Sequence, residues 1–224
     1  MNYFVLFIII ALLSWGVSAL LERRFKQYAK VALPLTGRQV AEKMLRDNGI
    51  MDVQVTCTPG HLTDHYDPRS KTVNLSESVY NSASVAAAAV AAHECGHALQ
   101  HAQGYAPIKL RSALVPVVSF ASQWITWVLL AGILLIEVFP MIMLVGIILF
   151  ALITLFSLVT LPVEVDASRR AIAWLESSGV THGIKTEHAK DALHAAAYTY
   201  VVAALSSLAT LMYYVMIFMG RSRD

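Results

Sequence analysis

The fold is decided by the stretch VFPMIMLVGIILFALITLFSLVTLPV, residues 138–163, which contains no Asp, Glu, Lys or Arg. A charge-free apolar run of this length supplies the ~20 residues that an α-helix needs to cross the hydrocarbon core of a bilayer. Three more charge-free runs occupy residues 2–21, 112–136 and 192–220. The sequence therefore predicts a polytopic membrane protein, mostly α-helical, with four transmembrane helices.

The composition of the whole chain supports this class. Of the 224 residues, 57% are hydrophobic and 14% are charged, whereas soluble domains average about 45–50% and about 25%. The formal net charge is only +2, which gives no basic footprint for nucleic acid. The two cysteines, Cys57 and Cys95, are too few for a cysteine-only zinc site, and we expect both to be reduced, buried, apolar side chains.

The charge pattern divides the chain into five segments. They are a transmembrane anchor at 1–21, a polar domain at 22–111, a transmembrane hairpin at 112–163, a second polar segment at 164–195, and a transmembrane helix with a short tail at 196–224. Segment 1–21 lacks the basic start and the cleavage site of a signal peptide, which predicts a retained membrane anchor.

Fifteen of the 17 basic residues lie in the two polar segments. The positive-inside rule therefore predicts a multi-pass protein of the cell membrane, with both polar segments cytosolic and both chain ends outside.

The first polar segment has the pattern of a small α+β domain. Its local signals predict a helix at 37–48 with a Thr36–Gln39 capping box, a strand at 53–57, a β-hairpin formed by 62–66 and 72–75, and a helix at 85–103 capped by Ser84. The last of these helices is rich in alanine and uncharged until residue 93. It is too short and too weakly apolar to span a membrane, so we expect it inside the domain.

That helix carries the motif His93-Glu94-Cys95-Gly96-His97, which matches HExxH. Imidazoles four residues apart share one helix face and bind one metal ion, while the intervening Glu serves as general base. A bare match of this kind often occurs by chance. Here the motif lies in a predicted internal helix, where two His and a Glu without a purpose would be costly to bury.

A catalytic zinc site usually takes a third protein ligand. His101 lies about 12 Å along the helix from His93, at ~1.5 Å per residue, which is too far for one ion to bind both. Glu164 stands at the end of an apolar run, where an ionisable group is usually functional, and we predict it as the third ligand. Asp166 is the alternative, either as ligand or as an acceptor that holds a ligand imidazole. The structural alternative is that both carboxylates merely pair with nearby arginines or solvent.

Four blocks of this sequence resemble the YugP-like neutral zinc metallopeptidases of bacterial membranes, and the similarity covers nearly the whole chain. The blocks are residues 62–68 (LTDHYDP), 91–97 (AAHECGH), 160–171 (TLPVEVDASRRA) and 199–201 (TYV). The layout is also similar to that of HtpX-type and CAAX-prenyl-type membrane proteases, in which a Glu opening an ExxxD motif completes the zinc site. Here the position of that Asp is Ser168, and this departure leaves Asp166 as the candidate for its role.

The resemblance implies a gluzincin-like (zincin) protease core with zinc as cofactor. His93 and His97 would be ligands, Glu94 the general base and later acid, and Glu164 the third ligand. The implied reaction is endopeptidase hydrolysis of membrane or membrane-proximal proteins by a zinc-activated water molecule. A second donor to the carbonyl oxygen is expected, and the sequence leaves Tyr198, Tyr200, His194, Arg169 and Arg170 as candidates for it.

Two other functions compete with this one. A zinc-binding scaffold, or a regulated subunit of a membrane complex with little proteolysis of its own, would have the same ligands. A transporter would need ionisable residues along its spans, and the apolar runs offer only Glu137 at a turn and His194 at an edge. The expected partners are a peptide or protein substrate and the lipid bilayer, and the sequence leaves open a partner membrane protein or a homo-oligomer.

Overall fold

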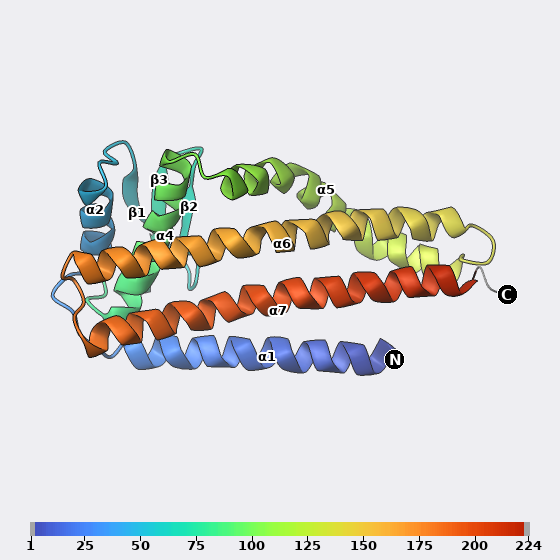
Figure 1. Cartoon of the computed structure of the whole chain (residues 1–224), viewed down its shortest axis with the longest axis horizontal. Helices are drawn as coiled ribbons and strands as arrows, with labels where there is room; N and C mark the ends of the chain where they lie inside the picture. Colours follow the sequence, from blue (N-terminus) through green and yellow to red (C-terminus); the bar gives the residue numbers. More distant parts are fainter. Residues whose placement is uncertain (1–2, 222–224) are drawn as a thin grey trace.

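A computed structural model describes residues 3–221 of the chain (Figure 1). The elements in chain order are α1 (Tyr3–Tyr28), α2 (Gly37–Asp47), β1 (Gln54–Thr58), β2 (His65–Asp67), β3 (Thr72–Ser76), α3 (Glu77–Tyr80), α4 (Val85–Ala102), α5 (Ala106–Leu134), α6 (Pro140–Ser177) and α7 (Ile184–Arg221). The mostly helical class predicted from the sequence is confirmed.

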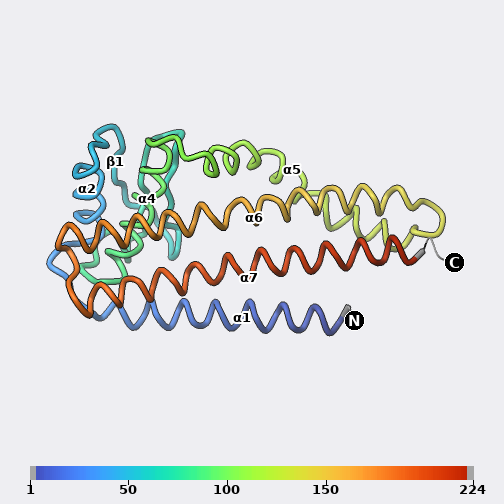
Figure 2. The backbone as a smooth tube through the Cα atoms, viewed as in Figure 1, coloured from blue at the N-terminus to red at the C-terminus, as the bar shows by residue number. Residues whose placement is uncertain are grey.

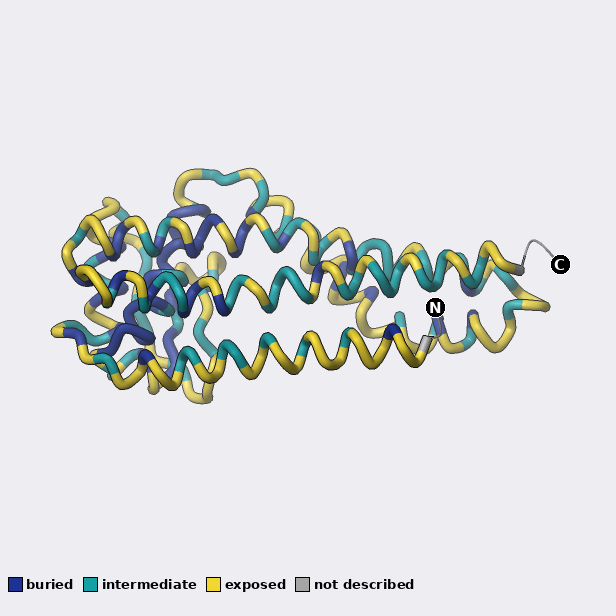
Figure 3. The backbone as a smooth tube through the Cα atoms, turned by 60° about the horizontal axis from the view of Figure 1, so that its bottom comes forward, coloured by how far each residue is buried: buried dark blue, intermediate teal, exposed yellow. Residues whose placement is uncertain are grey.

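Within residues 3–221, four helices are long and apolar enough to cross a membrane: α1, α5, α6 and α7. They lie side by side in a row, in which α6 packs between α5 and α7 and α1 packs along α7 (Figure 1). Most buried residues gather at the end that carries the small elements, while the far parts of the long helices are largely exposed or half-buried (Figure 3). Exposed apolar side chains along these helices are what a lipid-facing surface requires.

The α6 helix runs without interruption from the third apolar run into the second polar segment, through Pro162 (Figure 2). Likewise, α7 begins at Ile184 and continues through the fourth apolar run. The membrane helices thus extend directly into the polar region. The five-segment division of the chain stays a prediction, and its extreme termini lie outside the described residues.

The small domain contains a three-stranded sheet in the order β1-β3-β2 within the described residues. The strands β2 and β3 pair antiparallel, which confirms the predicted hairpin, whereas β1 pairs with β3 in parallel. The capping box of Thr36 and Gln39 is present, and α2 ends before Gly49 at φ +73°. The expectation that Cys57 is buried is wrong, because its side chain is exposed.

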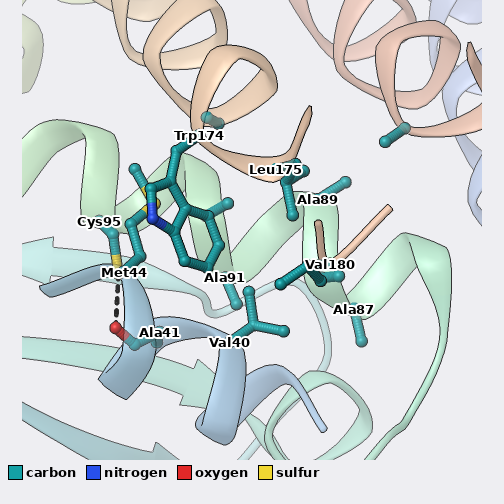
Figure 4. Packing of buried hydrophobic residues seen from close by; sticks show 14 of the residues in the cluster. Val40, Ala41, Met44, Ala87, Ala89, Ala91, Cys95, Trp174, Leu175 and Val180 are labelled. Carbon is teal, nitrogen blue, oxygen red and sulfur yellow. Dashed lines mark hydrogen bonds between the residues drawn. The ribbon is translucent and has the colours of Figure 1, made fainter. Parts of the chain in front are cut away.

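The alanine-rich α4 is the centre of the domain core. Residues 86–89, 91 and 92 are all buried and pack among α2, α6 and α7 (Figure 4). Cys95 is buried too, as predicted, and its thiol contacts the Ala41 carbonyl oxygen at 3.6 Å. Burial raises the pKa of the Cys95 thiol, so this side chain stays protonated and is unsuited to binding a metal ion.

Candidate metal centre

The α4 and α6 helices touch at a glycine. A Cβ atom added to Gly96 would lie 2.6 Å from the Ala167 carbonyl oxygen, a distance that real Cβ atoms do not reach. Only glycine therefore allows the two backbones to approach this closely. The contact places one face of the HExxH helix directly against the segment of α6 that holds Glu164.

Three side chains meet at this crossing: His93 and His97 from α4 and Glu164 from α6. Their donor atoms all lie within 4.8 Å of one another. The Glu164 Oε2 atom is 3.2 Å from His93 Nε2 and 3.6 Å from His97 Nε2. Tetrahedral zinc, with ligands at about 2.0–2.1 Å, separates neighbouring donor atoms by roughly 3.3 Å. The arrangement therefore fits a zinc ion in ligand type and in the distance of the Glu164 oxygen from each imidazole nitrogen.

The outer nitrogen of each imidazole also has a partner. His93 Nδ1 lies 3.1 Å from the Ser168 hydroxyl, and His97 Nδ1 lies 3.0 Å from Gln100 Oε1. A ring that donates Nδ1–H to these oxygens presents the lone pair of Nε2 to the metal side. His97 is thus held in the tautomer that a Nε2 ligand needs, and the Ser168 hydroxyl can accept from His93 Nδ1 in the same way. Ser168, where the related ExxxD motif has Asp, contacts His93 itself.

Gln100 links the two helices. Its side chain is fully buried, and its amide nitrogen donates to the Val163 carbonyl oxygen at 2.8 Å and to Asp166 Oδ2 at 3.0 Å. Every polar atom of this amide therefore has a partner. Asp166 lies outside the group of three donor side chains and reaches His97 only through Gln100.

The two arginines proposed near the site bind Asp166 instead. Arg169 pairs with one oxygen of Asp166 and Arg170 with the other. The Arg169 side chain is 79% exposed. Neither arginine lines the cavity that opens beside the candidate ligand group, which consists of His93, His97 and Glu164. Their position leaves them no contact with a substrate in that cavity.

A cavity of about 640 Å³ opens beside the three side chains. It is lined by Glu94, His101 and the ligand group from α4 and α6, by residues 64–69 around β2, by Ile108, Arg111, Ser112 and Val115 of α5, and by Tyr200 of α7. Of the candidate carbonyl-oxygen donors, only Tyr200 is among these lining residues. Tyr198 is largely exposed elsewhere on α7.

The imidazoles differ in electrostatic environment. Burial acts to lower the pKa of His97, but hydrogen bonding with Glu164 and the negative charges of Glu94 and Glu164 outweigh that effect and raise the pKa. Burial lowers the pKa of His101, which packs against the Tyr66 ring at 5.5 Å between centroids. His101 is therefore neutral at pH 7, lines the cavity and lies outside the group of donor side chains.

Sequence reasoning missed three residues of this region: Gln100, Arg111 and, as a partner of His93, Ser168. Arg111 forms an ion pair with Glu164, with 3.2 Å between Nη1 and Oε1. One signal was available for it, since Arg111 is the last charged residue before the apolar run at 112–136. No local pattern distinguishes Gln100 from an ordinary helix glutamine.

Comparison with known proteins agrees with the geometry. The sequence model of a family described as “Putative neutral zinc metallopeptidase” matches residues 3–219. The chain is 42% identical over 217 residues to a Bacillus subtilis (strain 168) protein named “Putative membrane protease YugP”, and the match covers 95% of each chain. No solved structure matches the chain. The resemblance to this family and zinc as its cofactor are thus confirmed.

Proposed function

This chain belongs to the “Putative neutral zinc metallopeptidase” family, and from that membership we propose that it is a membrane-embedded zinc endopeptidase. Its reaction is hydrolysis of peptide bonds in membrane or membrane-proximal proteins. One observation carries the proposal: His93, His97 and Glu164, from two helices, bring donor atoms within 4.8 Å of one another beside a cavity that Glu94 also lines.

In this proposal His93, His97 and Glu164 would hold the ion. Zinc, when bound, supplies a Lewis acid that polarises a carbonyl group and lowers the pKa of a water molecule towards about 7. Glu94 accepts a proton from the attacking water and then returns it to the leaving amine. The peptide C–N bond breaks, and Glu94 ends the cycle ionised as it began.

Tyr200 is the proposed donor to the carbonyl oxygen of the bond that is cut. Its support is position, because it lines the cavity on the α7 side, next to the ligand group. A phenol O–H at this place stabilises the negative charge that develops on that oxygen. Asp166 has a different proposed role, which is to hold Gln100 and through it His97, and Arg169 is assigned no role in the chemistry.

The edge of the sheet suits an extended substrate. The strand β2 is an edge strand in the order β1-β3-β2, and residues 64–69 around it line the cavity. A peptide that pairs with such an edge is held by main-chain hydrogen bonds, so binding depends little on its sequence. We propose that the substrate adds to β2 and lies across the metal ligands.

The opposite part of the cavity belongs to membrane helices. Ser112, Val115 and Tyr200 line it, and all three lie in charge-free runs of spanning length. The proposed cleavage site is therefore an extended stretch next to the transmembrane helix of a substrate protein.

Proteoliposomes test this function. A peptide with a membrane anchor and an extended polar stretch beside it is incubated with the reconstituted protein, together with the same peptide lacking the anchor. We expect mass spectrometry to find internal cuts close to the anchor and slower cutting of the soluble peptide. Equal cutting of both peptides would contradict the membrane-proximal assignment, and trimming from an end would contradict an endopeptidase.

The proposed site faces the cytosol. The start of α1, the α5–α6 turn and the end of α7 all lie at the opposite end of the molecule from the small domain (Figure 1). Because basic residues crowd the polar segments, we place that domain inside the cell and both chain ends outside.

Cysteine labelling of intact cells tests this orientation. Cys57 is exposed, so Cys57 and Cys95 are first replaced. An impermeant thiol reagent is then expected to label Ser222→Cys, which lies outside the described residues, and to label Ser70→Cys only after the membrane is opened. Labelling of position 70 in intact cells would place the site on the outer face.

The Gln100 contacts predict an effect on zinc affinity. We expect Gln100→Leu to weaken zinc binding about 10–100-fold, because His97 loses the acceptor that fixes its tautomer. Competition with a chelator measures this change. Gln103→Leu is the matched control, since Gln103 contacts Arg170 and not an imidazole. Unchanged zinc affinity in a folded Gln100→Leu protein would refute the role.

A further inference from the structure

Arg111 forms an ion pair with a member of the ligand group, and the proposed reaction assigns it no role. It lies in the first part of α5, and its Nη1 atom is 3.2 Å from Glu164 Oε1. The two His ligands contact the other oxygen, Oε2, of the same carboxylate. Glu164 therefore bridges the proposed metal position and a guanidinium group.

Apart from the ion pair with Glu164, the surroundings give Arg111 little structural reason to be there. The section of α5 before Pro116 is mostly exposed, with Ile108 as its buried anchor. The Glu164 side chain is 3% exposed, whereas that of Arg111 is 32% exposed and lines the cavity. Arginine carries five N–H donors, so several remain to face the cavity once Glu164 is bound. An ionisable group at the start of a membrane run usually serves function.

Arg111 also adds positive charge beside the ligand group. Glu94 and Glu164 together cancel the two charges of a divalent ion, so these three groups by themselves would carry no net charge. Arg111 adds one positive charge beside them. Peptide hydrolysis builds negative charge on the carbonyl oxygen, and a cation with fixed N–H donors beside that oxygen favours the transition state.

We propose that Arg111 is a catalytic residue: one N–H group stays on Glu164 Oε1 while others hydrogen-bond the carbonyl oxygen of the scissile peptide as it becomes negative, together with Tyr200. The inference rests on the proposed function and adds a substrate-contacting residue to it. Arg111 keeps its protons throughout, so proton transfer remains with Glu94.

The test compares Arg111→Met, Arg111→Lys and the control Lys109→Met in the full-length protein. Lys109 is an exposed cation two residues earlier on α5 that does not line the cavity. Three quantities are measured for each variant: zinc affinity by chelator competition, kcat and KM on an anchored peptide, and the Kd of a phosphinic peptide. The phosphinic group carries the tetrahedral shape and the negative charge that the substrate acquires only during reaction.

We expect Arg111→Met to lower kcat about 10²–10³-fold, to weaken the phosphinic peptide by a comparable factor, and to change KM and zinc affinity little. Arg111→Lys should recover part of the kcat, and Lys109→Met should match the wild type. If excess zinc restores the activity of Arg111→Met, Arg111 only positions Glu164 and the proposal is overturned. An unchanged kcat overturns it as well.

Failure of the proposed function would look different from failure of this inference. If the proposed function fails, the zinc-loaded wild type will cut no peptide. The Kd of the phosphinic peptide will still test the role of Arg111. Tight binding to the wild type that is lost in Arg111→Met would uphold the anion contact, and equal binding to both would refute it.

Discussion

Replacement of Glu94 by glutamine is expected to leave zinc bound and to lower peptide hydrolysis about 10²–10⁴-fold, because an amide cannot accept a proton from water. Glu94 is buried beside the ligand group and lines the cavity, yet it does not belong to the three side chains whose donor atoms meet. Zinc content and the rate of cleavage of an anchored peptide are measured on the same preparation.

The matched control for this variant is Glu77→Gln, which makes the same chemical change at an exposed position on α3, outside the cavity. It should keep wild-type activity. Full activity in a zinc-loaded Glu94→Gln protein would refute the role of Glu94 as general base. Loss of zinc from that variant would instead indicate that Glu94 is a ligand.

Loss of Glu164 is expected to have the largest effect on metal binding. Glu164→Ala removes the carboxylate that approaches from α6 and leaves two imidazoles from one helix. We expect zinc affinity to fall by more than the roughly 10–100-fold that loss of an outer hydrogen-bond partner causes. His101→Ala should retain zinc, because His101 lies outside the ligand group. Metal analysis after dialysis, with melting temperatures as a check on folding, measures the difference.

The reverse result, zinc kept by Glu164→Ala and lost by His101→Ala, would refute the ligand assignment. Asp166→Asn separates the two carboxylates further. Since Asp166 reaches His97 only through Gln100, we expect this variant to lose far less zinc than Glu164→Ala. Equal losses would favour Asp166 as a ligand.

The parts of this protein that could be predicted are those encoded by neighbouring residues. Long charge-free runs identify membrane helices because the bilayer core tolerates no unpaired charge. The caps of α2 and α4 depend on residues three positions apart, and the hairpin depends on its turn. The pair His93 and His97 follows from helix geometry alone.

Glu164 could be predicted from the sequence for a different reason. It is 71 residues from His93, and no local pattern joins the two. The cost of a carboxylate at the end of a membrane helix singled it out, and the structure brings it to the histidines. The same reasoning applied to Arg111, at the start of a run, would have found that residue too.

Other features depend on packing that no local pattern records. The close approach at Gly96 and Ala167, and the Gln100 contacts across it, exist only once α4 lies on α6. Continuation of α6 through Pro162 depends on neighbouring helices, which stabilise a helix that has lost one hydrogen bond. Cys57 is exposed although it alternates in phase with Val55, which packs against the core, so alternation alone does not say how far a side chain is covered.

The central claim is that zinc at this site drives proteolysis. The most direct measurement uses the wild-type protein in lipid vesicles with an anchored peptide, first as purified, then after removal of metal by a chelator, and finally after addition of one equivalent of zinc. We predict one zinc per chain, cleavage that disappears with the metal, and recovery when zinc returns. Cleavage that persists without metal, or a fully zinc-loaded protein that cuts no anchored peptide, would contradict the claim, and the second result would instead indicate a zinc-binding scaffold.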